Sequence, residues 1–497
     1  MTSVDHDVTG RAEPDAADID ACLRVLAQLP AYDSPHDAEG GSGSDQDPRW
    51  REVWQAVERA HREVKKARKN ARRADRRDGD RTATAATARF RDQDPDTLSA
   101  PAAPPPAPPA PPQARHSLGG ARQCYVCKAL FRELHAEYHM LCPECAEENM
   151  ARRFARCDLS GRRAIVTGGR IKIGFHVALK LLRDGAEVLV TTRFPRDAAR
   201  RFAAVPDAAD WTDRLHVHGV DLLDLPGVAG LLRTAHERFD HLDILINNAA
   251  QTIRRPAAYH REVHAAEAEP LTGPAARLEI TGRGPREPAR GDGPDAALPA
   301  LAPLPAEAMP AGPEPAGLET LFPAGRTDET GQPLDLRDRN SWSLRLHEVD
   351  PGEWLEVQMV NAFAPFLLTS RLRGLLEASP WPDRYVVQVS AMEGSFSRKG
   401  KTVRHPHTNM AKASLNMMTR TAGADYAASG IHMTSVDTGW ITDERPHPSK
   451  QAQRAIGFRP PLDVVDGAAR VYDPVVRGVG GERLSGLFLK DYRPVEW

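Results

Sequence analysis

A glycine-rich turn between an apolar strand and an amphipathic helix constrains the fold of this chain more than any other feature. The turn, TGGRIKIG, spans residues 167–174; the strand RAIV precedes it, and a second strand follows the helix after Gly185. At a turn of this kind, backbone N–H groups and the positive end of a helix can approach a pyrophosphate. The feature therefore predicts an α/β sheet of parallel strands with a dinucleotide at their carboxyl ends.

Seven short apolar segments repeat this alternation over residues 158–497, which is typical of an open, doubly wound parallel sheet. They are RAIVTG, AEVLVTTR, LHVHGVDL, LDILINNA, YVVQVSA, IHMTSVDTG and LSGLFLKD. A stretch rich in Pro, Ala and Gly, at about residues 256–340, interrupts them after the fourth segment. Because that loop leaves the sheet where ligands bind, we expect either a lid or partner surface near the cofactor, or disorder.

The N-terminal part of the chain divides into three segments by composition. Residues 1–48 are acidic and aperiodic and are expected to be disordered, apart from one apolar patch, IDACLRVLAQL, that can form a helix. Residues 49–78 lack Pro and Gly and carry a basic second half, which predicts a basic helix. Residues 79–118 are crowded with Pro and Ala and are expected to form an extended linker.

Four cysteines follow at metal-binding spacing. Cys124 and Cys127 form one CxxC pair, and Cys142 and Cys145 form a second pair after fourteen intervening residues. Together they offer four thiolates, which complete the closed tetrahedral shell of a structural zinc ion. A module of residues 119–157 has little core, so a metal would supply its folding free energy. We expect a zinc module with a structural or docking role, the alternative being a redox dithiol.

Several motifs together resemble the short-chain dehydrogenase/reductase (SDR) family over about residues 160–497. The turn at residues 167–174 matches the family pattern TGxxxGxG with Lys172 at the middle glycine. Residues 247–250, NNAA, are similar to its NNAG signature, and residues 436–442, VDTGWIT, are similar to its PGxxxT segment. The resemblance implies a Rossmann-type α/β fold, a nicotinamide cofactor and a small-molecule carbonyl or alcohol substrate.

The resemblance also implies a set of cofactor-binding residues. Arg193 follows the second strand, where family members that use NAD carry an acid; a basic residue there suits the 2′-phosphate of NADP, unless it only faces solvent. NADP is therefore expected, with NAD as the alternative. Lys172 is expected to meet a cofactor phosphate, Asp221 to lie beside the adenine and Thr442 to lie at the nicotinamide amide. The full set is Thr167, Gly168, Lys172, Ile173, Gly174, Arg193, Asp221, Leu222, Asn248, Lys412, Gly439 and Thr442.

The catalytic residues that the family implies are Asn, Ser, Tyr and Lys, and this chain keeps two of them. Asn361 matches the residue that holds a water in the proton relay, and Lys412 matches the lysine that holds the ribose. Ser390 lies one position before the family serine, which is Ala391 here, and Thr408 stands where the family has tyrosine. Because one step along a strand reverses the side-chain direction, Ser390 is a candidate only if the strand end twists.

The replacement of tyrosine by Thr408 changes the chemistry. A phenol titrates near pH 10 and can be lowered by a nearby ammonium, whereas a threonine hydroxyl titrates far higher. Thr408 can therefore orient a carbonyl but cannot act as a general base. His405 and His407 lie just before it, and we hypothesise that one of these imidazoles is the replacement acid.

We therefore expect an NAD(P)-dependent oxidoreductase that moves a hydride between NADP(H) and a carbonyl or alcohol. The altered serine and tyrosine positions leave a second hypothesis, a catalytically degenerate dinucleotide-binding sensor or scaffold that docks partners through its zinc module. The N-terminus lacks an apolar export segment and no run is long enough to span a bilayer, so a cytoplasmic protein without a membrane partner is expected. The net charge of -2 argues against a general polyanion binder; contact with nucleic acid is left to the basic helix, and a homo-oligomer is compatible with the family.

Overall fold

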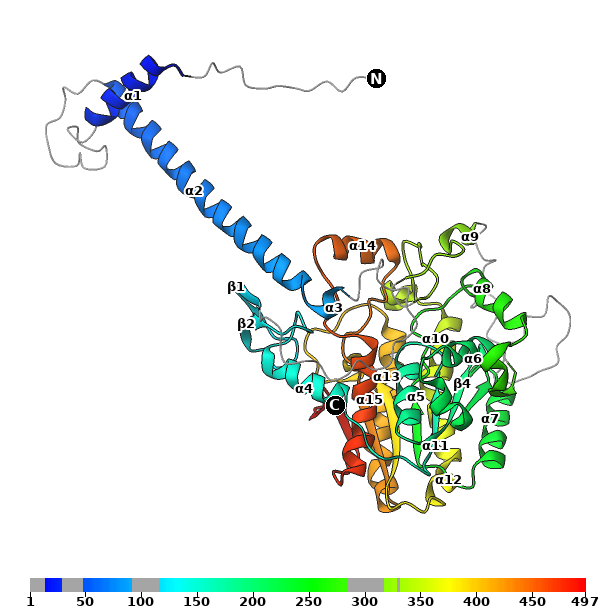
Figure 1. Ribbon diagram of the computed structural model, residues 1–497. Helices are drawn as coiled ribbons and strands as arrows, with labels where there is room; N and C mark the ends of the chain where they lie inside the picture. Colours follow the sequence, from blue (N-terminus) through cyan, green and yellow to red (C-terminus); the bar gives the residue numbers. More distant parts are fainter. Residues whose placement is uncertain (1–13, 29–47, 92–115, 284–316, 329–330) are drawn as a thin grey trace. The chain divides into compact units, whose positions relative to one another are not determined.

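The computed structural model describes residues 14–28, 48–91, 116–283, 317–328 and 331–497 (Figure 1). The chain divides into two compact units, Met1–Gly79 and Asp80–Trp497. The apolar patch of the first unit forms helix α1 (Ala16–Gln28), while the rest of the segment expected to be disordered, 1–13 and 29–47, lies outside the described residues. Over the described part of the chain, no helix combines the length and apolar character needed to cross a membrane.

The basic helix extends beyond the boundary that composition suggested. Helix α2 runs over Pro48–Ala85, and helix α3 (Ala88–Arg91) follows it, so the start of the predicted linker is helical. One glycine, Gly79, costs a helix only about 1 kcal/mol. The turn after it makes tertiary contacts, because the Asp80 carboxylate accepts a hydrogen bond from the backbone N of Gly119 at 2.6 Å. The linker's remaining residues, 92–115, lie outside the described part.

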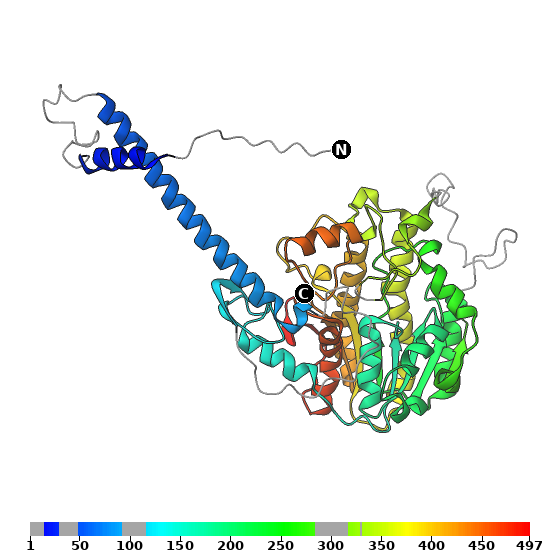
Figure 2. The ribbon, with the colours of Figure 1, turned by 45° about the horizontal axis from the view of Figure 1, so that its top comes forward.

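The cysteine-rich segment forms a hairpin followed by a helix. Strands β1 (His116–Gln123) and β2 (Leu130–Leu134) pair antiparallel, and helix α4 (Pro143–Arg153) begins at the second cysteine pair. This module belongs to the larger unit, and α4 packs against helix α15 (Val464–Val479) near the C-terminus (Figure 2). It is therefore part of one body with the sheet domain.

The larger unit is built on one sheet, whose described strands run in the order β11-β10-β9-β8-β6-β3-β4-β5-β7. All seven apolar segments predicted from the sequence form parallel neighbours in it. The chain moves outward from β3 through β4 to β5 and then returns to β6 on the other side of β3, so the strand order reverses there. This doubly wound, Rossmann-type α/β sheet confirms the predicted fold class. The strand bounds are β3 Arg163–Thr167, β4 Glu187–Thr192, β5 Leu215–Gly219, β6 Ile244–Asn247, β7 Glu279–Gly282, β8 Arg384–Ser390, β9 Ile431–Asp437, β10 Leu487–Lys490 and β11 Arg493–Val495.

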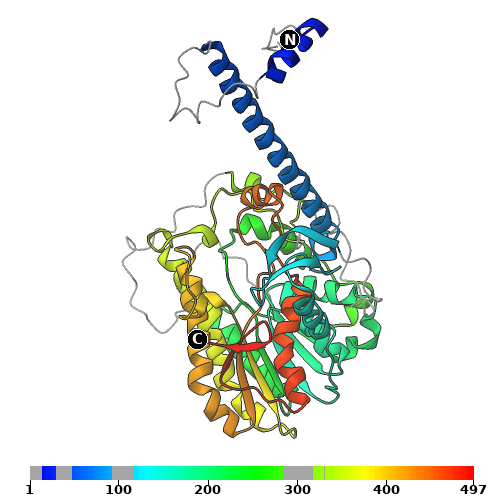
Figure 3. The same cartoon turned by 90° about the vertical axis from the view of Figure 1, so that its left-hand side faces the viewer.

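Side-chain alternation along the strands produces two cores, one on each face of the sheet. Ala164 and Val166 of β3 belong to the core under helices α5, α6 and α15, whereas Ile165 belongs to the core under α7, α11 and α12. Burial on both faces explains why these strands read as continuous apolar runs. Figure 3 shows α13 and α15 on opposite sides of the strands. The helix bounds are α5 Lys172–Arg183, α6 Pro195–Ala203, α7 Leu225–Arg238, α10 Pro351–Gln358, α11 Ala364–Arg371, α12 Arg373–Glu377, α13 Pro406–Ala428 and α14 His447–Ala455.

The Pro/Ala-rich insertion contributes to the fold. Helix α8 (Ala257–Ala268), strand β7 and helix α9 (Leu318–Leu321) all lie within it, and β7 adds a parallel edge strand beside β5. Across that pairing, His218 Nδ1 lies 2.9 Å from Thr281 Oγ1. Residues 284–316 lie outside the described part, whereas residues 339–344 line the cavity described next. Of the two alternatives left open for the insertion, its described part agrees with a wall near the cavity.

Candidate functional site

A cavity of about 2290 Å³ opens at the carboxyl ends of the parallel strands. Its wall consists of the glycine turn after β3, the loops after β4, β5, β6, β8 and β9, and residues 339–344 of the insertion. Open parallel sheets bind ligands at this edge, at the point where the strand order reverses. The topology therefore places the cavity where the sequence predicted a dinucleotide.

The glycine turn is packed too closely for a side chain at each of its glycines, Gly168, Gly169 and Gly174. A Cβ on Gly168, whose φ is +70°, would lie 2.9 Å from Ala249 Cα, and a Cβ on Gly174 would lie 2.3 Å from the carbonyl oxygen of Gly168. Asn248 Nδ2 donates to the carbonyl oxygens of Thr167 at 2.9 Å and Gly168 at 3.1 Å, which ties the end of β6 to the turn. The start of α5 is left as a bare backbone cradle that fits a diphosphate.

Lys172 takes the middle-glycine position and keeps its left-handed backbone, with φ +52°. For a residue with a Cβ, this conformation costs roughly 1–2 kcal/mol. Its Nζ lies 3.2 Å from Glu444 Oε1. Burial is the largest influence and opposes the charge of Lys172, but the attractions of Glu444, Asp328 and Tyr259 together outweigh it and raise the lysine pKa. Burial likewise favours the neutral acid at Glu444, yet Lys172 and Lys450 hold its pKa at about 2. Lys172 thus lines the cavity with a carboxylate partner, and its predicted contact with a cofactor phosphate stays a prediction.

Arg193, Asp221 and Leu222 lie together on the cavity wall, at the ends of β4 and β5. The Arg193 side chain is exposed, and among the described residues no carboxylate forms an ion pair with it. Its neighbour Arg170 is engaged, with Nη1 2.6 Å from Asp197 Oδ2. Arg193 is therefore the cation available to an anionic ligand at this end of the cavity.

Asn361 lies in a π-helical turn, Met359–Phe363, between α10 and α11. Its Nδ2 donates to the carbonyl oxygen of Gln251 at 2.9 Å, and its Oδ1 accepts from the backbone N of Gln251 at 2.6 Å. Single π turns inside helices frequently occur at functional sites. The side chain of Asn361 holds the loop after β6 in place, and its predicted role with a water stays a prediction.

Ser390 lines the cavity, but its hydroxyl is engaged with helix α13, and its predicted catalytic role stays a prediction. Its Oγ donates to Asn416 Oδ1 at 2.7 Å and lies 3.3 Å from the carbonyl oxygen of Lys412, so it is bound into helix α13. Side chains alternate along a strand, and the next residue, Ala391, offers only a methyl group. The serine position of the family therefore has no hydroxyl here.

Thr408, at the tyrosine position, lines the cavity beside His405. The Thr408 Oγ1 donates to the carbonyl oxygen of His405 at 2.9 Å and lies 3.5 Å from the ring Nδ1. The His405 ring is stacked on Trp342 of the insertion, with centroids 3.9 Å apart, and its Nδ1 lies 2.9 Å from Asn409 Oδ1. Burial lowers the pKa of His405, although the contact with Asn409 opposes that shift. A titratable ring thus stands next to the hydroxyl that replaced the phenol.

His407 lies elsewhere. It is buried, contributes to a small separate pocket beside Trp354 and Leu355, and has one ring nitrogen 3.5 Å from Glu353 Oε1. It does not line the main cavity. Because successive residues on a helix point about 100° apart, His405 and Thr408 face the cavity while His407 faces away. Of the two histidines considered, His405 lines the main cavity and His407 does not, and the role of an imidazole as the acid stays a hypothesis.

Lys412 lines the cavity one helical turn after Thr408. Its Nζ donates to the carbonyl oxygen of Val389 at 2.7 Å, and no described carboxylate pairs with it. Burial lowers the pKa of this lysine to about 8. Lys412 therefore lines the cavity beside Thr408, and its predicted role with the ribose stays a prediction.

The loop after β9 forms the far wall of the cavity. Gly439 has φ +79°, and its backbone N donates to Asp437 Oδ1 at 3.1 Å. Burial raises the pKa of Asp437 to about 6. The hydroxyl of Thr442 donates to Glu444 Oε1 at 2.7 Å and thereby joins the pair formed with Lys172. Both predicted residues of this loop, Gly439 and Thr442, line the cavity.

The four cysteines converge. The sulfur atoms of Cys124, Cys127, Cys142 and Cys145 all lie within 4.8 Å of one another, and Cys127 Sγ is 3.7 Å from Cys142 Sγ. A tetrahedral zinc with Zn–S bonds of about 2.3 Å requires sulfur–sulfur edges of roughly 3.8 Å. The donor set and its spacing therefore fit the metal that the spacing of the CxxC pairs predicted.

Three residues that shape the cavity have no counterpart in the sequence-based predictions. Trp342 lies in the insertion, where no motif indicates a ligand site. Glu444 lies just beyond the segment that resembles PGxxxT. Tyr125 lies between the cysteines of the first pair, and its position inside CYVC is the only signal that could have indicated it. All three line the cavity.

Comparison with known proteins agrees with this geometry. Residues 162–268 match the family model of the short chain dehydrogenases. An uncharacterized mimivirus protein, R665 from Acanthamoeba polyphaga mimivirus, is 31% identical over 371 residues, which cover 71% of this chain and 71% of that protein. Among characterised relatives, (+)-neomenthol dehydrogenase of Capsicum annuum is 33% identical over 92 residues, 18% of this chain and 29% of that enzyme. The chain thus matches most of the mimivirus protein but less than a third of that dehydrogenase.

Among solved structures, the NADPH-bound carbonyl reductase from chicken fatty liver shares 16% identity, with a TM-score of 0.42 over 68% of this chain and all of that one. The assignment of the fold rests on the strand order itself. The family match covers β3 to β6, which build the glycine turn and its clamp. The chain is thus related to the mimivirus protein over most of its length, and the part of it that matches the short chain dehydrogenase model is residues 162–268.

Proposed function

We propose that this protein is an NADP-dependent oxidoreductase that moves a hydride between NADP(H) and a carbonyl or alcohol. The observation that carries the proposal is the bare backbone cradle at Gly168 and Gly174, which opens onto the cavity with the exposed, unpaired Arg193 at the end of the neighbouring strand. The nicotinamide coenzyme, when bound, supplies or accepts the hydride. The chain's own residues bind it, orient it and manage the proton.

The binding roles follow from position on the wall. The amides at the start of α5 would hold the diphosphate, and Arg193 would hold a 2′-phosphate through charge-assisted hydrogen bonds. Asp221 and Leu222 would flank the adenine, because they end the next strand. Lys412, buried without a carboxylate, would donate to ribose hydroxyls and gain a polar partner when the site fills.

The proton role falls to His405. Thr408 cannot give or take a proton near neutral pH, but its hydroxyl lies 3.5 Å from the His405 ring and can orient the substrate oxygen. The nearby Asn409 oxygen accepts the Nδ1 proton, which leaves Nε2 as the atom that exchanges a proton. Stacking on Trp342 holds the ring in one orientation. A neutral imidazole with a lowered pKa suits a group that takes a proton from an alcohol at pH 7.

Coenzyme choice tests the first proposal. Titration of the full chain with NADPH and with NADH, followed by coenzyme fluorescence, should show tighter binding of NADPH. Arg193→Ala removes one charge-assisted contact, so it should raise the Kd for NADPH by about tenfold or more and leave the Kd for NADH unchanged. Arg196→Ala is the matched control, because the Arg196 guanidinium hydrogen-bonds to the carbonyl oxygens of residues 267–269 and lies outside the cavity wall. If Arg193→Ala lowers the affinity for NADPH and for NADH equally, Arg193 does not recognise a 2′-phosphate.

We further propose that the four cysteines hold a structural zinc ion. The 3.7 Å sulfur–sulfur contact and the four-thiolate donor set support a closed tetrahedral site, which leaves no coordination position for a substrate. Metal analysis of the purified protein should give about one zinc per chain. A second CxxC pair and the closed shell disfavour the redox dithiol.

A second candidate function has its own supporting observation. The serine position carries Ala391, Ser390 is bound into α13, and Thr408 replaces tyrosine, so the family's proton machinery is largely absent. A dinucleotide sensor or scaffold would tolerate these losses. Tight NADPH binding with no coenzyme oxidation across a panel of aldehydes, ketones and quinones would favour the sensor; turnover that is lost in His405→Gln would favour the enzyme.

A further inference from the structure

The four-cysteine module does not stand apart from the cavity. Leu118, Phe131, Leu134, Tyr138, Leu141, Ala146 and Met150 of the module share one buried core with Ile441 and Leu462 of the sheet domain. Ile441 lies in the loop after β9, and Ile173, in the glycine turn, packs against the same core. The core of the module thus touches the loop after β9 and the glycine turn, the two segments proposed to hold the nicotinamide end and the diphosphate of the coenzyme.

A single hydroxyl links the first cysteine knuckle to the loop after β9. Tyr125 stands between Cys124 and Cys127; its backbone N donates to the carbonyl oxygen of Met140 at 2.8 Å, and its hydroxyl accepts from the backbone N of Trp440 at 2.9 Å. A Cβ on Gly439 would lie 3.4 Å from that hydroxyl and 2.6 Å from Leu462. The knuckle thus contacts the loop directly at Gly439 and Trp440, while Leu462 of the sheet domain fills the remaining space beside Gly439.

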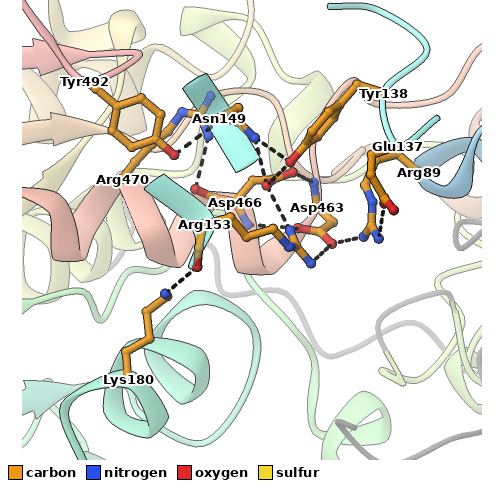
Figure 4. A network of polar contacts seen from close by, with 10 residues as sticks. All are labelled: Arg89, Glu137, Tyr138, Asn149, Arg153, Lys180, Asp463, Asp466, Arg470 and Tyr492. Atoms are coloured by element: carbon orange, nitrogen blue, oxygen red, sulfur yellow. Dashed lines mark hydrogen bonds and ion pairs between the residues drawn. The ribbon is translucent and has the colours of Figure 1, made fainter. Parts of the chain in front are cut away.

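A buried polar network fixes the module on the other side (Figure 4). Tyr138 donates its hydroxyl proton to Asp466 Oδ1 at 2.7 Å, Asn149 donates to the same oxygen at 2.9 Å, and Arg153 bridges Asp463 at 2.6 Å and Asp466 at 2.8 Å. Asp463 caps helix α15 by accepting from the backbone N of Asp466 at 2.8 Å. Because these charges are buried, breaking the network would leave them uncompensated.

We propose that the metal-ordered knuckle positions the nicotinamide loop, residues 438–442, and that Tyr125 is the positioning residue that transmits the order. The inference rests on the proposed coenzyme function. A metal at the four sulfurs fixes the backbone on both sides of Tyr125, the Tyr125 hydroxyl fixes the amide of Trp440, and the loop then presents its backbone to the nicotinamide end. Metal content therefore controls the affinity for coenzyme without the metal touching it.

The test uses Tyr125→Phe, which removes one hydroxyl and leaves the ring and all four thiolates. Loss of a hydrogen bond to a backbone amide should raise the Kd for NADPH by about fivefold while zinc content stays the same. Amide hydrogen exchange at residues 438–442 should accelerate by a similar factor. Tyr426→Phe is the matched control: its hydroxyl also contacts backbone, the carbonyl oxygen of Thr369 at 3.2 Å, but in the core on the opposite face of the sheet. It should lower the melting temperature without changing the Kd or the exchange of the loop.

Reversible removal of the metal by a chelator, measured on the same full chain, is the second arm. Metal removal should accelerate amide hydrogen exchange at residues 438–442 and raise the Kd for NADPH at least as much as Tyr125→Phe does. Added zinc should restore both the exchange rate and the Kd. Unchanged Kd and unchanged loop exchange in Tyr125→Phe overturn the inference while the coenzyme proposal stands. If wild-type protein binds neither NADPH nor NADH, the proposed function is overturned. Hydrogen exchange at residues 438–442 then still tests the inference, which is overturned if metal removal leaves that exchange unchanged.

Discussion

Replacing Lys412 with methionine should make the coenzyme-free protein more stable. The ammonium is buried in the cavity wall, donates to one carbonyl oxygen, that of Val389, and has no carboxylate partner among the described residues. Burial lowers its pKa from 10.5 to about 8. The folded protein therefore carries a charge that its surroundings do not compensate. Such a charge is expected at a site that binds a polar ligand.

The size of the effect follows from that difference in pKa. A lowering from 10.5 to about 8 corresponds to roughly 3 kcal/mol of free energy of unfolding near pH 7, where the lysine is charged in both states. The side chain still reaches cavity water, and methionine forfeits a hydrogen bond worth about 1 kcal/mol. We therefore expect Lys412→Met to gain about 1–2 kcal/mol in stability.

The pH dependence identifies the cause. Between about pH 8 and pH 10.5 the folded wild-type protein releases the Lys412 proton while the unfolded chain keeps it, so wild-type stability rises with pH in that window. Lys412→Met lacks the group, and its advantage should shrink across the same window. Urea unfolding near pH 7 and again near pH 10 measures both differences.

Lys450→Met is the control, with the opposite expected sign. Its Nζ lies 3.3 Å from Asp328 Oδ2, so removal of Lys450 leaves a carboxylate without that partner and should destabilise the protein. If Lys412→Met is no more stable than wild type near pH 7, or if its advantage persists unchanged near pH 10, then uncompensated burial does not set the state of Lys412 and the reasoning is refuted.

Two further predictions concern the cradle and the proton donor. Gly174→Ala should cost about 2–3 kcal/mol, because its Cβ would meet the Gly168 carbonyl oxygen at 2.3 Å and backbone cannot move aside; it should also abolish NADPH binding, and wild-type affinity in the coenzyme titration would contradict the cradle. His405→Gln should lower kcat by about a hundredfold and remove the limb of the pH–rate profile that the imidazole produces. His407→Gln should stay within about twofold of wild type, since that ring lies outside the main cavity, and equal losses in the two variants would remove His405 from the mechanism.

Much of the cofactor half of the site was predictable from the sequence because it depends on local backbone. Gly168 has φ +70°, which favours glycine, and a Cβ on Gly174 would collide with the carbonyl oxygen of Gly168, six residues earlier. The side-chain contacts of the site were not predictable in the same way. The sequence suggests a phosphate contact for Lys172, and only the structure shows Glu444, far along the chain, 3.2 Å from it. The difference is that a turn is specified by neighbours in sequence, whereas an ion pair is specified by tertiary distance.

The end of helix α2 and the edge strand of the sheet also depend on tertiary contacts and not on the local sequence. Helix α2 continues past Gly79 because Asp80 bonds to Gly119, and β7 forms from a weakly apolar segment because β5 offers it an open edge. Neither event leaves a periodic signal in the residues concerned. Composition therefore predicted a linker from residue 79, where the chain is still helical, and left open whether the insertion forms a wall near the cofactor or is disordered.

The sequence by itself determined the parallel sheet, the diphosphate cradle and the four-thiolate cluster, because each depends on residue types at short, fixed spacing. Only the tertiary structure decided that His405 and not His407 faces the cavity, that the Ser390 hydroxyl is bound into α13, and that Tyr125 of the cysteine module bonds to Trp440. Those outcomes depend on which atoms meet across long separations in sequence, and packing settles them through helix phase, strand alternation and a shared core.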